Sequence, residues 1–92
     1  MRLLIIEDEK KVADFIARGL RAERFAVDVA RDGMAGWEMV SAVNYDLVVL
    51  DLMLPGISGT EILRRLRCRG GNAAILVLTA RDATNDKVEN FE

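Results

Sequence analysis

Cysteine is scarce in this 92-residue sequence, where Cys68 is the single thiol. One thiol cannot form a disulfide within the chain, and a lone bystander thiol is typical of a reducing cytoplasm. A membrane-length apolar run is also lacking, since the longest one covers only residues 73–78. The N-terminus resembles a secretion signal only as far as residue 6, where a charged stretch begins. These shortages predict a cytoplasmic protein without a membrane segment.

Positive charge is not in excess either. The 13 basic and 15 acidic residues give a net charge of −2, which argues against a chain that grips nucleic acid by itself. Repeats and low-complexity stretches are missing, and the mixed charges are typical of a solvated surface. The length fits one small domain with a modest core.

Four short apolar runs are typical of β-strands: residues 3–6, 26–30, 47–50 and 75–78. Three are apolar throughout, which indicates strands covered by helices on both faces. The run at 26–30 alternates and carries Asp28, which fits a strand at a sheet edge. Helical spacing fills the segments between the strands. The pattern therefore predicts an α/β fold, a doubly wound parallel sheet with right-handed crossovers.

The predicted helices differ in their start and stop signals. In the first, apolar residues fall on one side, and in the second, glycines weaken the helical pattern. The third begins with the capping box Ser58 and Glu61 and stops at two glycines, and a fourth is expected from Thr84 to Glu92. The apolar sides are expected to hold Val12, Phe15, Ile16 and Leu20 in the first helix and Gly33, Gly36, Trp37 and Val40 in the second.

Acidic and hydroxyl side chains follow three of the predicted strands. The first strand ends at Glu7 and Asp8, the third at Asp51 and the fourth at Thr79. Ligands of open α/β sheets bind past the carboxyl ends of the strands, so neighbouring strands would bring these residues into one crevice. Clustered carboxylates repel each other, and hard oxygen ligands suit Mg²⁺. A carboxylate beside Mg²⁺ can attack a phosphoryl group and form an aspartyl phosphate.

Each of these residues also has a simpler interpretation. An acidic turn after a strand commonly complements the dipole of the next helix. Asp51 alone fits the N-cap of the following turn, and Thr79 alone fits a cap or strand-end residue. Only their joint placement favours a metal site with phosphoryl chemistry.

Three stretches, "LLIIEDE", "YDLVVLDLMLPGISG" and "ILVLTARD", resemble the receiver domain of bacterial two-component response regulators. "MRLLIIEDE" and "TARDATNDKV" resemble its OmpR/PhoB-type branch, whose members are transcription factors. The resemblance implies a flavodoxin-like fold with strand order 2-1-3-4-5. Residues 1–92 would be an incomplete receiver domain with βα units one to four, strand order 2-1-3-4, and the fifth strand and helix missing.

The resemblance also implies residue roles. Asp51 would be the phosphoacceptor that receives a phosphoryl group from a sensor histidine kinase. Asp8 would be the principal acid for Mg²⁺, Glu7 would act through water, and Met53 would offer its backbone carbonyl. A phosphoryl group on Asp51 would switch a DNA-binding domain that lies beyond this chain.

Two further roles concern the phosphoryl group itself. Thr79 would bond a phosphoryl oxygen and move when Asp51 is charged, and Ala80 would leave room for the group. The family's fifth-strand Lys has no counterpart here, and Lys87 matches the solvated face of the fourth helix instead. Phosphorylation of this chain is therefore expected to be slow or absent, with weak Mg²⁺ binding retained.

Two departures from the family affect the fold. Arg24 stands where glycine is common after the first helix, and a left-handed backbone there costs about 1 kcal/mol. Loss of the fifth strand would expose residues 75–78 as a sheet edge, which predicts a homodimer or oligomer.

Other functions remain as alternatives. A Mg²⁺-dependent phosphatase of the haloacid-dehalogenase type usually has a second Asp where this chain has Met53. A flavodoxin-type flavin domain would want a phosphate-binding loop where Glu7 and Asp8 would repel phosphate. A receiver-like interaction module that no longer takes phosphate is favoured only by the missing end.

Overall fold

The computed structural model describes residues 1–71 and 73–78 of the chain. Strands and helices alternate strictly over this part, as the apolar pattern predicts. Their bounds are β1 (Arg2–Ile6), α1 (Lys10–Ala22), β2 (Ala26–Ala30), α2 (Gly33–Ala42), β3 (Leu47–Asp51), α3 (Gly59–Arg69) and β4 (Ala74–Leu78). The expected fourth helix lies outside the described residues.

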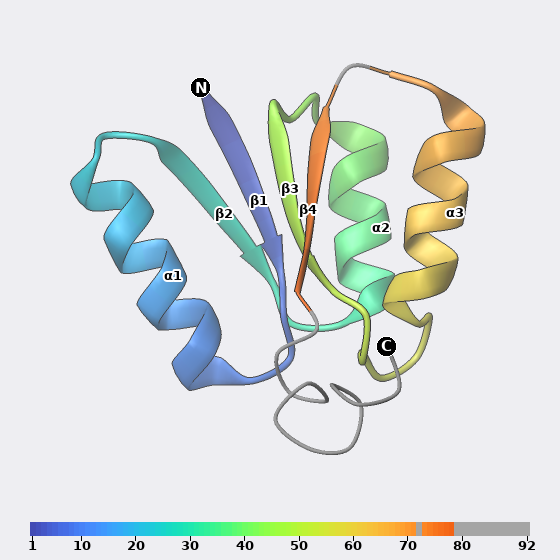
Figure 1. The fold of residues 1–92 in the computed structure, drawn as a ribbon, viewed down its shortest axis with the longest axis horizontal. Helices are drawn as coiled ribbons and strands as arrows, with labels where there is room; N and C mark the ends of the chain where they lie inside the picture. Colours follow the sequence, from blue (N-terminus) through green and yellow to red (C-terminus); the bar gives the residue numbers. More distant parts are fainter. Residues whose placement is uncertain (72, 79–92) are drawn as a thin grey trace, which may run out of the picture.

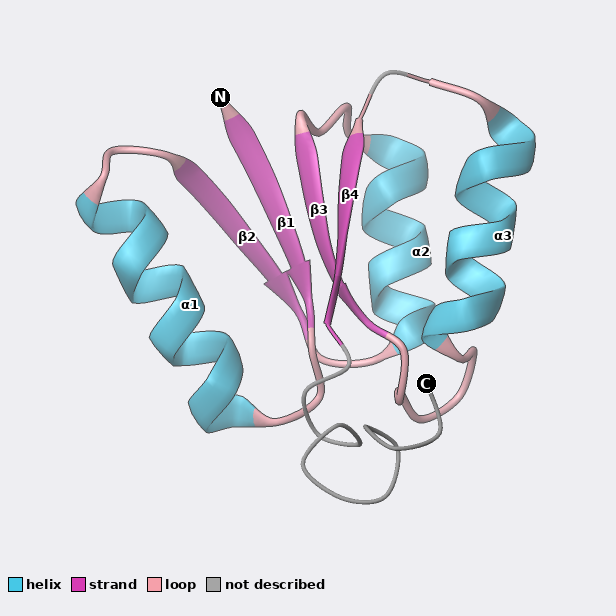
Figure 2. Ribbon diagram, in the orientation of Figure 1, coloured by secondary structure: helices cyan, strands magenta, loops and turns pink. Residues whose placement is uncertain are grey.

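The strands form one parallel sheet in the order β2-β1-β3-β4. Helix α1 covers one face, and α2 and α3 cover the other (Figures 1 and 2). The predicted flavodoxin-like fold with strand order 2-1-3-4 is confirmed. From β1 the chain moves outward to β2 and then crosses back to β3, which makes the β1/β3 boundary the switch point of the sheet.

Strand β1 is buried on both faces. Leu4 and Ile6 pack into the cluster under α2 and α3, while Leu3 and Ile5 pack into the cluster under α1. These four side chains are at most 1% exposed. Successive residues of a strand point to opposite faces, so a strand covered on both sides needs a continuous apolar run.

Helix α1 corrects one prediction. Phe15 was expected on the buried side, but its side chain is 77% exposed. The buried positions are Ala13 and Ala17, with Ile16 and Leu20 packed beside them. These four residues follow the i, i+3, i+4, i+7 spacing of one face, and Phe15 lies on the opposite side of the helix.

Among the described residues no helix is long and apolar enough to cross a bilayer.

Helix α2 forms despite its glycines, and its packing explains one of them. A Cβ atom on Gly36 would lie 2.7 Å from Cδ1 of Ile6. The glycine therefore lets the helix approach β1 closely, and this tertiary contact outweighs the low helix propensity of glycine. The helix predicted around Gly33 and Val40 is confirmed.

Helix α1 ends in a left-handed residue, as the sequence suggests. Arg24 has φ of 72°, its N–H donates to the Arg21 carbonyl, and the Phe25 N–H donates to the Leu20 carbonyl. These two bonds make a Schellman motif. Arginine therefore carries a cost of about 1 kcal/mol at a position that suits glycine.

Helix α3 has the predicted cap in part. The Ser58 hydroxyl accepts a bond from the Glu61 N–H at 3.2 Å, and Gly70 ends the helix with φ of 78°. The Glu61 carboxylate accepts bonds from the guanidinium groups of Arg64 and Arg65. These ion pairs lower the pKa of Glu61 to about 2.

Strand β2 lies at a sheet edge, as its alternating pattern predicts. Its Asp28 accepts bonds from the Tyr45 hydroxyl at 2.7 Å and from Arg2. The Tyr45 bond is the main cause that lowers the pKa of Asp28, and Arg2 acts in the same direction. A charged residue in the strand is thus tied to β1 and to the turn before β3.

Candidate functional site

Three carboxylates meet at the switch point of the sheet. Ile6 of β1 pairs with Leu50 of β3, so the next residues lie at adjacent strand ends: Glu7 directly follows β1, and Asp51 is the last residue of β3. Asp8 comes directly after Glu7, and one carboxylate oxygen from each of the three acids lies within 4.8 Å of the others. The structure therefore brings Glu7, Asp8 and Asp51 together in the way that a shared cation requires.

Two of these acids are buried. Asp51 is 3% exposed and Glu7 is 4% exposed. Backbone donors compensate part of the loss of water, because Asp51 Oδ1 accepts from the Met53 N–H at 3.0 Å and Glu7 Oε2 accepts from the Glu9 N–H at 2.9 Å. A bound cation would lower the cost of burying the charge of these carboxylates further.

The pKa of Glu7 is raised by its surroundings. Burial raises the pKa of Glu7 from 4.5 to about 7, and the neighbouring Asp51 and Asp8 carboxyls add to the rise. The hydrogen bond from the Glu9 N–H acts in the opposite direction. Near neutral pH the cluster therefore holds a proton readily, and a divalent cation that replaces it would relieve the same repulsion.

The turn before α1 is tied to the turn after β2. The Glu7 N–H donates to the Ala30 carbonyl at 3.0 Å. The Arg31 guanidinium donates to the Asp8 carbonyl, at 2.9 Å from Nη2 and 3.3 Å from Nε. Sequence reasoning missed Arg31, since nothing in its local pattern marks a residue that reaches across to another turn.

The turn after Asp51 is packed against backbone at two glycines. A Cβ atom on Gly59 would collide with the Asp51 carbonyl oxygen, and one on Gly33 would collide with the Ile57 carbonyl oxygen. The Gly59 N–H also donates to the Leu52 carbonyl at 3.2 Å. Sequence reasoning placed Gly33 on an apolar helix face and missed the role of both glycines in shaping this turn.

The remaining predicted site residues are placed as follows. Met53 donates its N–H to Asp51, and its side chain is 49% exposed. Thr79 and Ala80 lie outside the described residues, as does Lys87. The described part of the predicted site is therefore the three acids and the turn that carries Met53.

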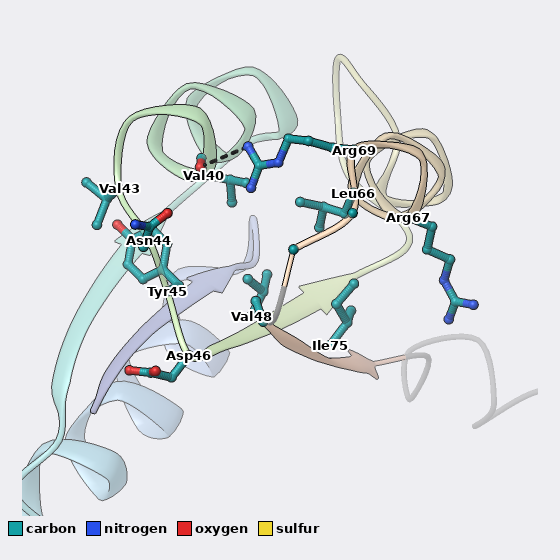
Figure 3. Close-up of a pocket in the computed structure, with 13 residues that line it drawn as sticks. Val40, Val43, Asn44, Tyr45, Asp46, Val48, Leu66, Arg67, Arg69 and Ile75 are labelled. Carbon is teal, nitrogen blue, oxygen red and sulfur yellow. Dashed lines mark hydrogen bonds between the residues drawn. The ribbon is translucent and has the colours of Figure 1, made fainter.

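A cavity of about 670 Å³ lies away from these acids. It opens between the C-terminal ends of α2 and α3 and the beginnings of β3 and β4, with Arg69 reaching across it to the Val40 carbonyl (Figure 3). Val48, Leu66 and Ile75 line its apolar side. Since the strands are parallel, this cavity is at the opposite end of the sheet from the carboxylates.

Comparison with known proteins agrees with this geometry. Residues 3–92 match the family model of the response regulator receiver domain. The chain belongs to the response regulator receiver domain family, in agreement with its strand order. Among curated proteins, it is 40% identical over 92 residues to the transcriptional regulatory protein CusR of Escherichia coli K12. The alignment covers all of this chain and 40% of CusR, so the chain spans less than half of that relative.

Two solved structures are similar in fold and sequence. The Thermotoga maritima response regulator TrrA, in complex with Mg²⁺-BeF, has a TM-score of 0.82 and 31% identity. That match covers 98% of this chain and 78% of TrrA. A Burkholderia pseudomallei response regulator with a phosphorylated aspartic acid and a calcium ion has a TM-score of 0.78 and 31% identity, over 85% of this chain and 46% of that one. The curated relatives, CusR among them, are transcriptional regulators of the OmpR/PhoB type, as the family resemblance of the sequence implies.

Proposed function

We propose that this chain is the phosphoacceptor module of a two-component transcriptional regulator, with Asp51 as the residue that takes the phosphoryl group. The observation that supports this most directly is the cluster of Glu7, Asp8 and Asp51 at the switch point. Asp51 is the last residue of β3, and the bond to the Met53 N–H fixes its carboxylate. The donor is a sensor histidine kinase, whose phosphohistidine N–P bond breaks as the aspartyl O–P bond forms.

The donor set fits Mg²⁺. Three carboxylates offer hard oxygen ligands, and Asp8 is only partly buried, which leaves space for the water that Mg²⁺ keeps. Asp8, Asp51 and the Met53 carbonyl would hold the cation, and Glu7 would act through water. When bound, the cation supplies positive charge for the transferring oxygens. The TrrA complex with Mg²⁺-BeF is consistent with this assignment.

The rest of the switch is proposed from the family. Thr79 would bond a phosphoryl oxygen, and Ala80 would leave space beside it. In the longer regulator the phosphorylated domain would control a DNA-binding domain in the cytoplasm. The activity is regulatory, since the phosphoryl group stays on the chain's own Asp51 until it is hydrolysed.

Asp51→Asn tests the proposal. The affinity for Mg²⁺, measured by isothermal titration calorimetry at pH 8, is expected to fall about tenfold or more, because the substitution replaces a charged carboxylate ligand of the cation with a neutral amide. Labelling with acetyl phosphate, detected by mass spectrometry, is expected to be slow in the unaltered chain and absent in the variant. Glu38→Gln is the matched control, because it makes the same change from acid to amide at an exposed residue of α2 that does not belong to the cluster of Glu7, Asp8 and Asp51. Equal Mg²⁺ affinity for Asp51→Asn and the unaltered chain would remove the basis of the proposal.

Strand β4 supplies a further proposal, that the chain self-associates through its edge. In the part of the chain that the structure describes, β4 pairs only with β3, and Leu76 on β4 is 54% exposed. Leu76→Lys is expected to shift the chain toward a 10.2 kDa monomer, because a charge on an edge strand opposes pairing. Light scattering over a concentration series measures this, with Met34→Lys on α2 as the control, since Met34 is equally exposed at 57%. A monomeric unaltered chain at all concentrations would contradict it.

A further inference from the structure

Arg31 holds one particular peptide unit of the acid cluster. Its guanidinium donates two bonds to the Asp8 carbonyl oxygen, at 2.9 Å and 3.3 Å. That carbonyl belongs to the same planar peptide as the Glu9 N–H, which donates to Glu7 Oε2 at 2.9 Å. The side chain of Arg31 is thus linked to the Glu7 carboxylate through a single rigid peptide.

The two ends of this peptide act on both acids of the β1–α1 turn. Rotation of the peptide plane would move the N–H away from Glu7 and would turn the backbone from which the Asp8 side chain projects. The guanidinium offers two donors in a fixed fork, so it restrains this rotation better than a single donor does. Bonds in series also polarise one another, which strengthens the Glu9 N–H as a donor.

The backbone that carries Arg31 is itself bonded to the turn after β1. Arg31 follows the last residue of β2, and the Ala30 carbonyl just before it accepts the Glu7 N–H at 3.0 Å. The turn after β2 therefore contacts the turn after β1 at two consecutive residues. Arg31 comes from outside the acid cluster but fixes its backbone.

We propose that Arg31 is a positioning residue for the cation site, which orients Glu7 and Asp8 through the Asp8–Glu9 peptide. The proposal rests on the assignment of Mg²⁺ to this cluster. It makes the site dependent on a residue that contributes no ligand atom.

Whether Mg²⁺ affinity falls or rises when the Arg31 guanidinium is removed distinguishes a positioning role from an effect of its charge alone. A guanidinium near a cation site repels the cation, so removing its charge would tighten Mg²⁺ binding if charge were its only effect. Loss of positioning has the opposite sign, since misdirected carboxylates bind more weakly. Groups that orient ligands from outside typically change metal affinity by about tenfold to a hundredfold.

Arg31→Gln and Arg31→Lys in the 92-residue chain test the proposal. Mg²⁺ affinity is expected to fall about tenfold in both, because the lysine keeps the charge but loses the fork. Arg67→Gln is the matched control, as Arg67 is exposed on α3 and lines the cavity at the other end of the sheet. Unchanged or tighter Mg²⁺ binding in Arg31→Gln would overturn the proposal, and so would full affinity in Arg31→Lys.

A second measurement needs no metal. In the metal-free chain, NMR is expected to show that Arg31→Gln shifts the Asp8 carbonyl carbon and the Glu9 amide, while Arg67→Gln leaves them in place. A purely structural role would lower the stability of the chain without moving these signals or the Mg²⁺ affinity of folded molecules. If the unaltered chain binds no Mg²⁺, the proposed function fails. The Glu9 amide then decides separately whether Arg31 holds the peptide, and an unmoved signal would refute that.

Discussion

Gly59→Ala is expected to lower the free energy of unfolding by about 2 to 3 kcal/mol, because the new methyl group collides with backbone. The Cβ atom would overlap the carbonyl oxygen of Asp51, and the Cα atom of Leu52 is almost as close. Backbone atoms cannot change rotamer, so α3 or the end of β3 has to shift. The displaced carbonyl belongs to the proposed phosphoacceptor, and we therefore expect weaker Mg²⁺ binding as well.

Gly19→Ala provides the matched control for that variant. Gly19 is exposed in α1, and nothing lies within 4 Å of a Cβ atom added there. The same chemical change should raise stability by roughly 0.5 to 1 kcal/mol, because alanine is the better helix former. Urea unfolding with linear extrapolation measures both variants. Equal changes in the free energy of unfolding for the two variants would show that the backbone around Gly59 has room for a methyl group.

The metal-free chain is expected to lose stability as the pH rises from 4.5 to 7. The pKa of Glu7 is about 7 in the folded chain against an ordinary value of 4.5. Over this range the folded state keeps a proton that the unfolded state has released, so the contribution of Glu7 is complete below pH 4.5 and lost as the pH passes 7. The loss amounts to roughly 3 kcal/mol, and it should appear as a lower melting temperature in EDTA.

Glu7→Gln isolates this contribution. The variant cannot lose a proton, so at pH 8 without metal it should be more stable than the unaltered chain, and the difference should vanish near pH 4.5. Asp28, Asp14 and Glu61 have lowered pKa values, and their effects at low pH are common to both chains. Mg²⁺ should stabilise the unaltered chain more strongly at pH 8 than at pH 6, since the cation binds the deprotonated cluster. Parallel pH profiles for the two chains would contradict the role assigned to Glu7.

The local pattern of residues was enough to predict the alternating elements. A strand covered on both faces has to be apolar at every position, and residues 3–6 and 47–50 show this without knowledge of the rest. The placement of acids at strand ends also follows from local order, because parallel strands end at the same edge of the sheet. The order of strands in the sheet was predicted from the family resemblance, because the residues of an apolar strand do not indicate which other strands pair with it.

Sequence by itself thus determined which residues become strands, and that Glu7, Asp8 and Asp51 lie at the carboxyl ends of β1 and β3. Tertiary structure alone decided what depends on distances between separate segments. It turned Phe15 outward, because the small side chains of Ala13 and Ala17 face the sheet. It also made Gly59 a backbone contact and set Arg31 on the Asp8 carbonyl, 23 residues away. Periodicity reports burial within one element, whereas close approach between elements exists only after they pack.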